Sequence, residues 1–333
     1  MKSQKKIDWN KSWDITKKIL TQSKISGKSV LNGAIGNHLE RFDFLAQGMG
    51  FFVNGQAVPI TKEELQKRTF NSRICILIHG LVSDETMWKI PKTDSDYGSL
   101  LKEDLGIEPF YLRYNSGRHI SDNGKEFDEL LSFLVKQLPK ECKEIDLIGH
   151  SMGGLVIRSA CYYGKKRKSK WIDKVKNVIF IGSPHHGAPL EKLGNTVSTV
   201  LGKIPNPFTY LTKKAINLRS DGIKDLRYGF LVEEDWKGKD LDQYIRFEKT
   251  HVPLLPKVKY YVITGTLMED TSHWLSELFG DAIVGKWSGR GKSADEKDEL
   301  LIPKENFREF GGITHIQLMH DLKVYDQIKI WLQ

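Results

Sequence analysis

The sequence predicts an α/β fold in which helices cover both faces of one mostly parallel sheet. From residue 73 onward, short apolar runs alternate with segments of helical periodicity, which is the pattern that such a sheet requires. The chain has 333 residues, of which 39% are hydrophobic and 28% are charged, enough to bury the core of one large α/β domain. A peptide-sized module and a wholly disordered chain are thereby excluded.

Five apolar runs are the candidate strands of this sheet. Each run is short and continuous, as a strand buried on both faces must be. They cover residues 74–78, 110–114, 145–148, 178–181 and 258–263.

Helical periodicity marks the segments between and after these runs. Between the second and third runs, the apolar residues of 127–138 fall on one face of a helix that Pro139 ends. The same spacing recurs over residues 324–332. Residues 190–257 separate two strands by far more than one crossover needs, which predicts an inserted helical cap.

The first 72 residues precede this alternation. Apolar residues from Leu31 to Phe42 recur at helical spacing, and Asn54-Gly55 lies between two apolar runs, as in a β-hairpin with a tight turn. We expect residues 1–72 to form helices and a hairpin packed on the core. Residues 73–333 would form the main domain, with the cap at about 190–257.

The formal net charge is +9, and part of this excess is concentrated in residues 165–176. A run of this kind forms either the solvated surface of a loop after a helix or a docking surface for an anionic membrane. No zinc-finger, RNA-recognition or helix-turn-helix pattern accompanies it, so a nucleic-acid partner is not expected.

Cysteine usage and hydropathy predict where the protein resides. Only Cys75, Cys142 and Cys161 are present, and an odd number fits reduced thiols better than a disulfide framework. The sequence has neither an apolar run of about 18–20 residues nor a secretory h-region after its charged start. We therefore expect a soluble, cytoplasmic protein.

A glycine-rich turn that begins at Gly149 is the strongest chemical signal. Gly149-His150-Ser151-Met152-Gly153 follows the third candidate strand and leads into a helical pattern. In a sharp strand-to-helix turn, flanking glycines allow the serine oxygen to stand above the sheet edge, and the next helix points its positive end at the site. Ser151 is therefore the candidate nucleophile.

A serine nucleophile needs a base, which in this kind of sheet follows the serine and the acid along the chain. His315 follows a strand-like run and a loop ahead of the last helical segment, which predicts a position at the carboxyl edge of the sheet. His320, at the start of that helical segment, is the alternative.

The acid that orients the base should lie beyond the fifth strand and before His315. Asp281 occupies a glycine-flanked loop, Gly280 to Gly285, in which an Ile-Val pair can anchor the turn. Asp270, nearer the end of the strand, is the alternative.

Backbone N–H groups must also stabilise the oxyanion that forms during acyl transfer. One donor is expected from Met152, the residue after the nucleophile. The other is expected from Leu81, because His79-Gly80-Leu81 follows the first strand and its glycine frees the backbone to turn.

Several motifs taken together resemble the α/β-hydrolase superfamily. Within it, the sequence is similar to bacterial lipase/esterase-like proteins related to the GPI inositol-deacylase (PGAP1-like) group. The resemblance extends from about Val30 to Leu332. Its motifs are residues 79–81, 113–121, 149–154, 182–189, 219–229 and 315–320.

The resemblance implies the same active-site residues as the reasoning from motifs and spacing. It assigns Ser151 as nucleophile, His315 as base and Asp281 as acid, with Leu81 and Met152 as oxyanion donors. The membrane-bound deacylases carry transmembrane helices that this sequence lacks, so GPI itself is not the expected substrate.

The pair His185-His186 raises the question of a metal. Adjacent residues seldom bind one ion together, and no cluster of Cys or Asp with ligand spacing surrounds the pair. In the resemblance, this turn shapes the rim of the site. No metal and no cofactor are therefore expected.

The function expected from these residues is hydrolysis of carboxylic esters, with an acyl or lipid-like ester as substrate and peripheral contact with an anionic membrane. Acyl transfer or amide cleavage would use the same three residues, since the pocket selects the acceptor. A catalytically silent hydrolase fold used for binding is the third alternative.

Overall fold

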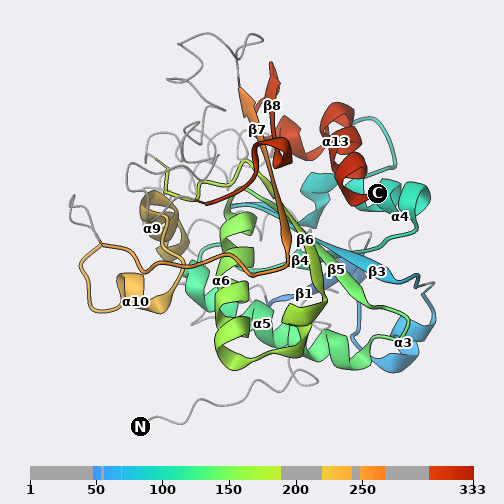
Figure 1. Cartoon of the computed structure of the whole chain (residues 1–333), viewed down its shortest axis with the longest axis horizontal. Coiled ribbons are helices and arrows are strands. Elements are labelled where there is room, and N and C mark those ends of the chain that lie inside the picture. Colours follow the sequence, from blue (N-terminus) through green and yellow to red (C-terminus); the bar gives the residue numbers. More distant parts are fainter. Residues whose placement is uncertain (1–47, 54–55, 69, 189–219, 242–247, 267–299) are drawn as a thin grey trace, which may run out of the picture.

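The computed structural model describes residues 48–53, 56–68, 70–188, 220–241, 248–266 and 300–333. Its strands are β1 Gly50–Val53, β2 Gln56–Ala57, β3 Arg73–Ile78, β4 Glu108–Arg113, β5 Glu144–His150, β6 Val175–Ile181, β7 Lys259–Thr266 and β8 Phe307–Gly311. They form one sheet in the order β2-β1-β4-β3-β5-β6-β7-β8 (Figure 1). Strands β3 to β8 pair in parallel, and β1 pairs antiparallel with β2 and β4. The predicted mostly parallel sheet is confirmed.

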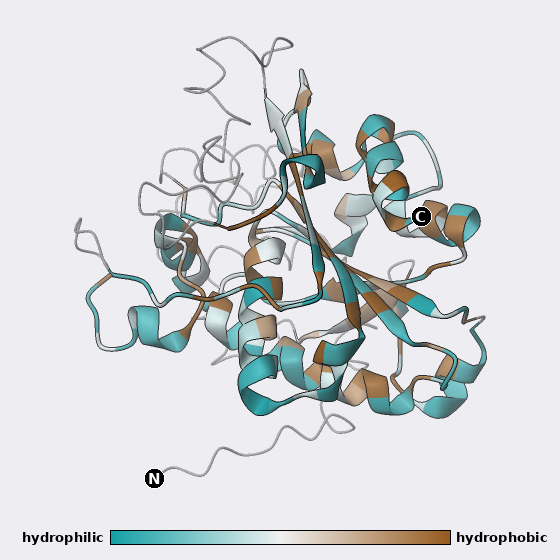
Figure 2. Cartoon of the chain, in the orientation of Figure 1, coloured by the Kyte–Doolittle hydropathy of each residue, from teal (hydrophilic) through white to brown (hydrophobic). Residues whose placement is uncertain are grey.

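Helices cover this sheet on both faces. The helices are α3 Lys62–Gln66, α4 Tyr97–Leu105, α5 Ile120–Gln137, α6 Met152–Arg167, α9 Asp221–Tyr228, α10 Glu233–Trp236 and α13 Leu322–Leu332. Helices α5 and α6 lie on one face, and α4 and α13 lie on the other (Figure 1). Figure 2 shows hydrophobic residues along the strands, whereas the helices carry hydrophobic and hydrophilic residues. This is the layering expected of an α/β fold.

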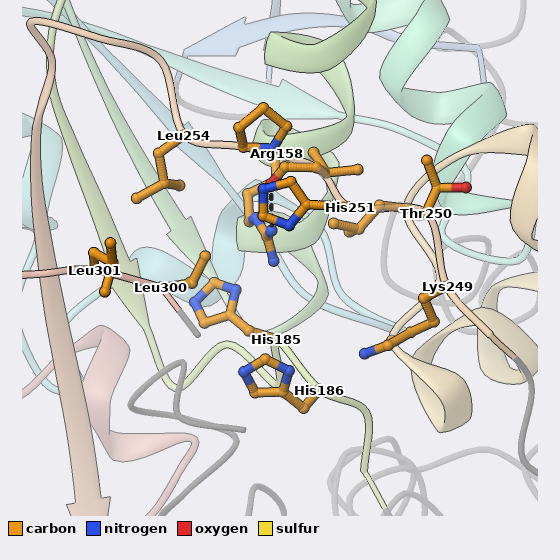
Figure 3. Close-up of a pocket in the computed structure, with 13 residues that line it drawn as sticks. Arg158, His185, His186, Lys249, Thr250, His251, Leu254, Leu300 and Leu301 are labelled. Atoms are coloured by element: carbon orange, nitrogen blue, oxygen red, sulfur yellow. Dashed lines mark hydrogen bonds between the residues drawn. The ribbon is translucent and has the colours of Figure 1, made fainter. Parts of the chain in front are cut away.

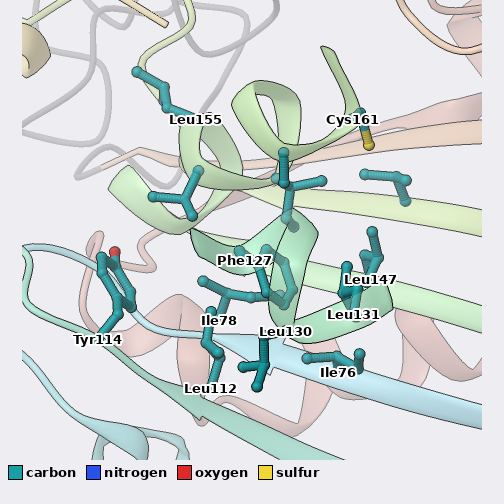
Figure 4. Close-up of a cluster of buried hydrophobic side chains, with 14 of the residues drawn as sticks. Ile76, Ile78, Leu112, Tyr114, Phe127, Leu130, Leu131, Leu147, Leu155 and Cys161 are labelled. Atoms are coloured by element: carbon teal, nitrogen blue, oxygen red, sulfur yellow. The ribbon is translucent and has the colours of Figure 1, made fainter. Parts of the chain in front are cut away.

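Two hydrophobic clusters, one on each face, form the core. Alternate residues of β3 illustrate the division: Ile74, Ile76 and Ile78 face the cluster under α5 and α6, whereas Cys75 and Leu77 face the cluster under α4 and α13. Figure 4 shows the first cluster, in which Phe127 of α5 packs against the strands. Burial on both faces explains why the strands read as continuous apolar runs.

Local sequence fixes the ends of the flanking helices. Helix α5 ends at Gln137, two residues before Pro139, as expected from the missing N–H and fixed φ of proline. Helix α13 begins after Asp321, whose side chain accepts a hydrogen bond from the N–H of Lys323 at 2.9 Å.

The N-terminal hairpin joins the main sheet. Strands β1 and β2 pair antiparallel, with Phe52 opposite Ala57, and β1 also pairs with β4. The expected tight turn at Asn54-Gly55 lies outside the described residues. The division of the chain at residues 72 and 73 stays a prediction.

The basic run 165–176 is not the continuous loop that one reading of the sequence predicted. It spans the last turn of α6, a 3₁₀ helix at Lys170–Lys174 and the start of β6. Acidic groups distant in sequence lie against it: Arg167 pairs with Glu129 at 2.8 Å, and Lys176 pairs with Glu144 at 2.8 Å. The charge of the run is therefore partly compensated in the fold.

Several expectations fall outside the described residues. These are the helices before residue 48, most of the first half of the cap, and both candidate acids, Asp281 and Asp270. The described parts of the expected cap segment are residues 220–241, which contain helices α9 and α10, and residues 248–257. Within the described ranges, no helix has both the length and the apolar character needed to cross a membrane.

Candidate active site

Ser151 occupies a sharp turn between β5 and α6. Its backbone has φ 53° and ψ −121°, a left-handed conformation that non-glycine residues rarely adopt. The N–H of Ser151 donates to the carbonyl of Ile181 in β6 at 2.8 Å, which ties the turn to the neighbouring strand. The predicted strand–turn–helix context of the serine is therefore present.

Gly153 lets α6 begin directly against the end of β3. A Cβ at this position would overlap the carbonyl oxygen of Ile78 and lie 2.6 Å from that of His79. Both neighbours are backbone carbonyl oxygens, which cannot shift without distorting the end of β3. The glycine after Ser151 is thus required by packing between the helix and the strand.

The loop after β3 lies directly against the serine. A Cβ at Gly80 would lie 3.0 Å from the Cβ of Ser151 and 3.2 Å from Nδ1 of His150. The expected oxyanion donors are the residues that follow these two: Leu81 comes after Gly80, and Met152 comes after Ser151. Both are buried. The fold therefore brings together the two loops that were predicted to supply the N–H groups.

His79 fixes the shape of this loop. Its Nδ1 donates to the carbonyl oxygen of Gly80 at 2.8 Å, and its ring stacks on Tyr114 with the centroids 4.4 Å apart. Because the C=O and N–H of a trans peptide point in opposite directions, the bond to Gly80 also sets the direction of the Leu81 N–H. Burial lowers the pKa of His79 to about 4, so this imidazole is neutral at physiological pH.

Tyr114 and Ser116, which follow β4, hold the loop from its other side. The hydroxyl of Tyr114 donates to the carbonyl of His79 at 2.9 Å. The N–H of Val82, a residue with φ 59°, donates to Oγ of Ser116 at 3.1 Å. These contacts join residues more than 30 positions apart, and no sequence motif pointed to them.

His315 lies beside the residue that precedes the nucleophile. It follows β8, as predicted, and is 2% exposed. Nε2 of His150 donates to the carbonyl oxygen of His315 at 3.0 Å, and the two rings lie 4.5 Å apart. Burial, followed by the nearby His315, lowers the pKa of His150, which therefore remains a neutral donor.

His320, the alternative base, lies after a 3₁₀ turn at Gln317–Met319 and before α13, not within the start of the helix. It is half-buried. His315, whose carbonyl accepts the hydrogen bond from His150, stays the predicted base.

The third member of the predicted site stays a prediction. Asp281 and its alternative Asp270 lie outside the described residues. Among the described residues, no three His, Cys, Asp or Glu side chains gather in the way that a metal site needs.

Comparison with known proteins supports the fold. Residues 113–246 match the family model of the PGAP1-like alpha/beta domain. A comparison with curated proteins finds no match.

Solved structures that are similar to this chain include a lipase and an esterase. A lipase of Bacillus licheniformis in its mature form has a TM-score of 0.50 and 17% identity, over 79% of this chain and 92% of that one. Its propeptide form has a TM-score of 0.51 and 15% identity, over 85% of this chain and 52% of that one, so this chain spans about half of that form. An esterase of Pyrococcus furiosus has a TM-score of 0.42 and 14% identity, over 79% and 80% of the chains.

The family match begins at the last residue of β4 and includes β5, the Ser151 turn, α6 and the described cap helices. The two comparisons with the B. licheniformis lipase extend the likeness in fold over 79% and 85% of this chain. This chain has the α/β-hydrolase fold, and its residues 113–246 are similar to the PGAP1-like alpha/beta domain.

Proposed function

We propose that the protein is a serine hydrolase that cleaves carboxylic esters. The observation that carries this proposal is the left-handed turn of Ser151 at the start of α6, with the loop of Gly80 and Leu81 packed against it. A serine held in this way, with backbone donors beside it, suits attack on an acyl carbon.

In the proposed reaction, Oγ of Ser151 forms a bond to the acyl carbon while its proton passes to His315. The N–H groups of Leu81 and Met152 donate to the oxyanion, and each such donor contributes about 3 kcal/mol to lowering the barrier. The intermediate then expels the alcohol, which takes the proton from His315, and leaves an acyl-enzyme.

Water completes the cycle by the same route. His315 removes a proton from the water, whose oxygen attacks the acyl carbon to form a second oxyanion. This oxyanion collapses to the free acid as the bond between the acyl carbon and Oγ of Ser151 breaks, and Oγ takes the proton back from His315. The carboxylate of Asp281 is proposed to hold the imidazole of His315 in the required tautomer.

The proposed substrate is an acyl or lipid-like ester. The solved structures with TM-scores of 0.50 and 0.51 are named lipases, which supports this class. A cytoplasmic setting and peripheral contact with an anionic membrane remain part of the proposal. The three described cysteines are unpaired and buried, which agrees with a reducing compartment.

A panel of p-nitrophenyl esters from acetyl to palmitoyl tests the proposal. We expect hydrolysis of at least one ester with a kcat/KM at least 1,000-fold above that of Ser151→Ala, because the variant lacks the nucleophile. Ser169→Ala, two residues beyond the end of α6, is the matched control and should keep full activity. The proposal is wrong if no ester is cleaved or if Ser151→Ala is as active as the natural chain.

A further inference from the structure

A second site lies at the same edge of the sheet as the Ser151 turn, in a cavity of about 220 Å³ (Figure 3). Neither Ser151 nor His315 lines it. The basic and imidazole side chains that line it are Arg158, His185, His186, Lys249 and His251. Its volume is below the roughly 300–1,000 Å³ of sites for drug-sized ligands, so it suits a small group.

The donors of this cavity come from α6, the loop after β6 and the segment before β7. Arg158 lies one helical turn beyond Gly154 on α6, and a Cβ at Gly154 would overlap the hydroxyl of Ser183, so this helix face packs against the loop after β6. That loop carries His185 and His186. Nη2 of Arg158 donates to the carbonyl of Val252 at 2.9 Å, which ties the helix to the segment before β7.

His185 is a buried polar side chain whose ring nitrogens have no hydrogen-bond partner among the described residues. It is 1% exposed, and its ring packs edge-on against Phe180 with the centroids 4.6 Å apart. Neither Nδ1 nor Nε2 of this ring has a hydrogen-bond partner among the described residues. A buried polar group without a partner is costly, which indicates that the ring has a role beyond packing.

The charge of the cavity wall points to an anion. No Asp or Glu is among the described residues that line it. Burial, followed by the positive charge of Arg158, lowers the pKa of His185, so the imidazole is neutral and offers one N–H. An anion in the cavity would face Arg158 and Lys249 and would give this N–H an acceptor.

The number of donors favours phosphate over carboxylate. A carboxylate has two oxygens, whereas a phosphate has three or four and carries up to two negative charges near neutral pH. Donors converge on the cavity from α6, the loop after β6 and the segment before β7 (Figure 3). Such an arrangement can reach several sides of a tetrahedral oxyanion.

We propose that this cavity binds the phosphate group of a ligand, through Arg158, His185, His186 and Lys249. The apolar part of the wall, which includes Val252 and Leu300, would contact the carbon atoms next to the phosphate. This inference concerns a site other than Ser151 and holds independently of the proposed ester chemistry. The phosphate belongs either to a free phosphate ion or to the diester of a lipid headgroup.

Isothermal titration of the full chain with inorganic phosphate and with diethyl phosphate tests this inference, at constant ionic strength set with chloride. Saturable binding of either probe is expected. Binding of inorganic phosphate alone would identify free phosphate as the source, whereas comparable binding of diethyl phosphate would identify a lipid headgroup. Absence of saturable binding of both probes would overturn the proposal.

Variants separate this cavity from general surface charge. Lys249→Gln should weaken binding at least fivefold, because it removes a positive charge that faces the anion. His186→Leu should also weaken binding at least fivefold, because it removes an N–H donor to the anion. Lys165→Gln is the matched control: it removes an exposed lysine of α6 that does not line the cavity and should leave the affinity unchanged. Equal loss in Lys249→Gln and Lys165→Gln would contradict the assignment.

Two further variants keep the test decisive. His185→Leu should weaken phosphate binding and also raise the melting temperature, because it removes a buried polar ring without a hydrogen-bond partner. A ring with a purely structural role would show loss of stability and unchanged binding. Ser151→Ala should bind phosphate with natural affinity, so failure of the ester chemistry would not affect this result.

Discussion

His150 links the turn of Ser151 to the loop of the expected base. Its Nε2 donates to the carbonyl of His315 at 3.0 Å, and a Cβ at Gly80 would lie 3.2 Å from its Nδ1. The side chain thus lies against the loop of His315 and the loop of Gly80, both of which the proposed reaction needs. It can act on the reaction through these loops and need not contact the reacting atoms. We interpret His150 as a positioning residue.

This interpretation predicts different effects for two substitutions at His150. His150→Leu removes the hydrogen bond to the His315 loop and should lower kcat about fivefold to tenfold with little change in KM, since one buried hydrogen bond contributes about 1 kcal/mol. His150→Gln retains an N–H donor and should recover part of the loss. Steady-state ester hydrolysis provides the measurement.

A purely structural role would give another result. In that case His150→Leu and His150→Gln would lower thermal stability to a similar extent, and kcat per folded molecule would not change. Circular dichroism on the same samples distinguishes the two roles.

At the scale of elements, an ionisable pair joins the start of α5 to helix α9. Nδ1 of His119 lies 3.0 Å from the carboxylate of Asp225 in α9, and the His119 ring stacks on Trp236 of α10 at 3.6 Å. The same carboxylate accepts from the N–H of Ile120 at 2.7 Å. Helices α9 and α10 are thereby both anchored at the start of α5.

The pKa values of this pair make the anchor dependent on pH. Burial raises the pKa of Asp225 to about 6. Burial acts to lower the pKa of His119, but the hydrogen bond and charge of Asp225 outweigh it, so this pKa is raised above its usual value. Both groups therefore hold protons more tightly in the folded chain than in the unfolded one.

The pair should therefore stabilise the fold less as the pH rises. The contribution of Asp225 falls from about pH 4 to pH 6, and that of His119 falls above about pH 6.5, its ordinary pKa. Asp225→Asn removes the titrating carboxyl and should flatten this dependence. We expect the difference in free energy of unfolding between the natural chain and this variant to shrink by about 1–3 kcal/mol from pH 5 to pH 8.

Urea unfolding at both pH values gives that difference. Asp173→Asn, an exposed aspartate in the 3₁₀ helix before β6, is the control and should differ equally from the natural chain at both values. A difference for Asp225→Asn that is constant, or that grows with pH, would contradict the assigned pKa directions.

At the scale of the whole molecule, the sequence predicted most of the sheet and the turn of the nucleophile. The apolar runs were recognisable because strands β3 to β7 are buried on both faces, and the turn was recognisable because Gly153 must pack on the backbone of β3. In the strands and in the turn of Ser151, the local sequence pattern agrees with the fold. Apolar periodicity and glycine spacing were therefore sufficient to predict both.

Features that depend on contacts between distant segments were not predicted. His79 and Tyr114 are 35 positions apart, and their stacking shows no local pattern. The compensation of the basic run was equally hidden, since Arg167 meets Glu129 only after α5 and α6 pack together. Only the order of the strands brings such residues to one place.

The central claim is that Ser151 is activated by His315 and oriented by Asp281, and covalent labelling with a fluorophosphonate tests it most directly. Attack by Oγ of Ser151 would form an O–P bond and release fluoride, and peptide mass spectrometry would locate the label. We expect labelling at Ser151 that is lost in Ser151→Ala and slowed at least 100-fold in His315→Ala. Asp281→Asn should also slow it, whereas Asp270→Asn and Ser169→Ala should not. A folded chain that never labels at Ser151, or that labels equally fast without His315, would contradict the account.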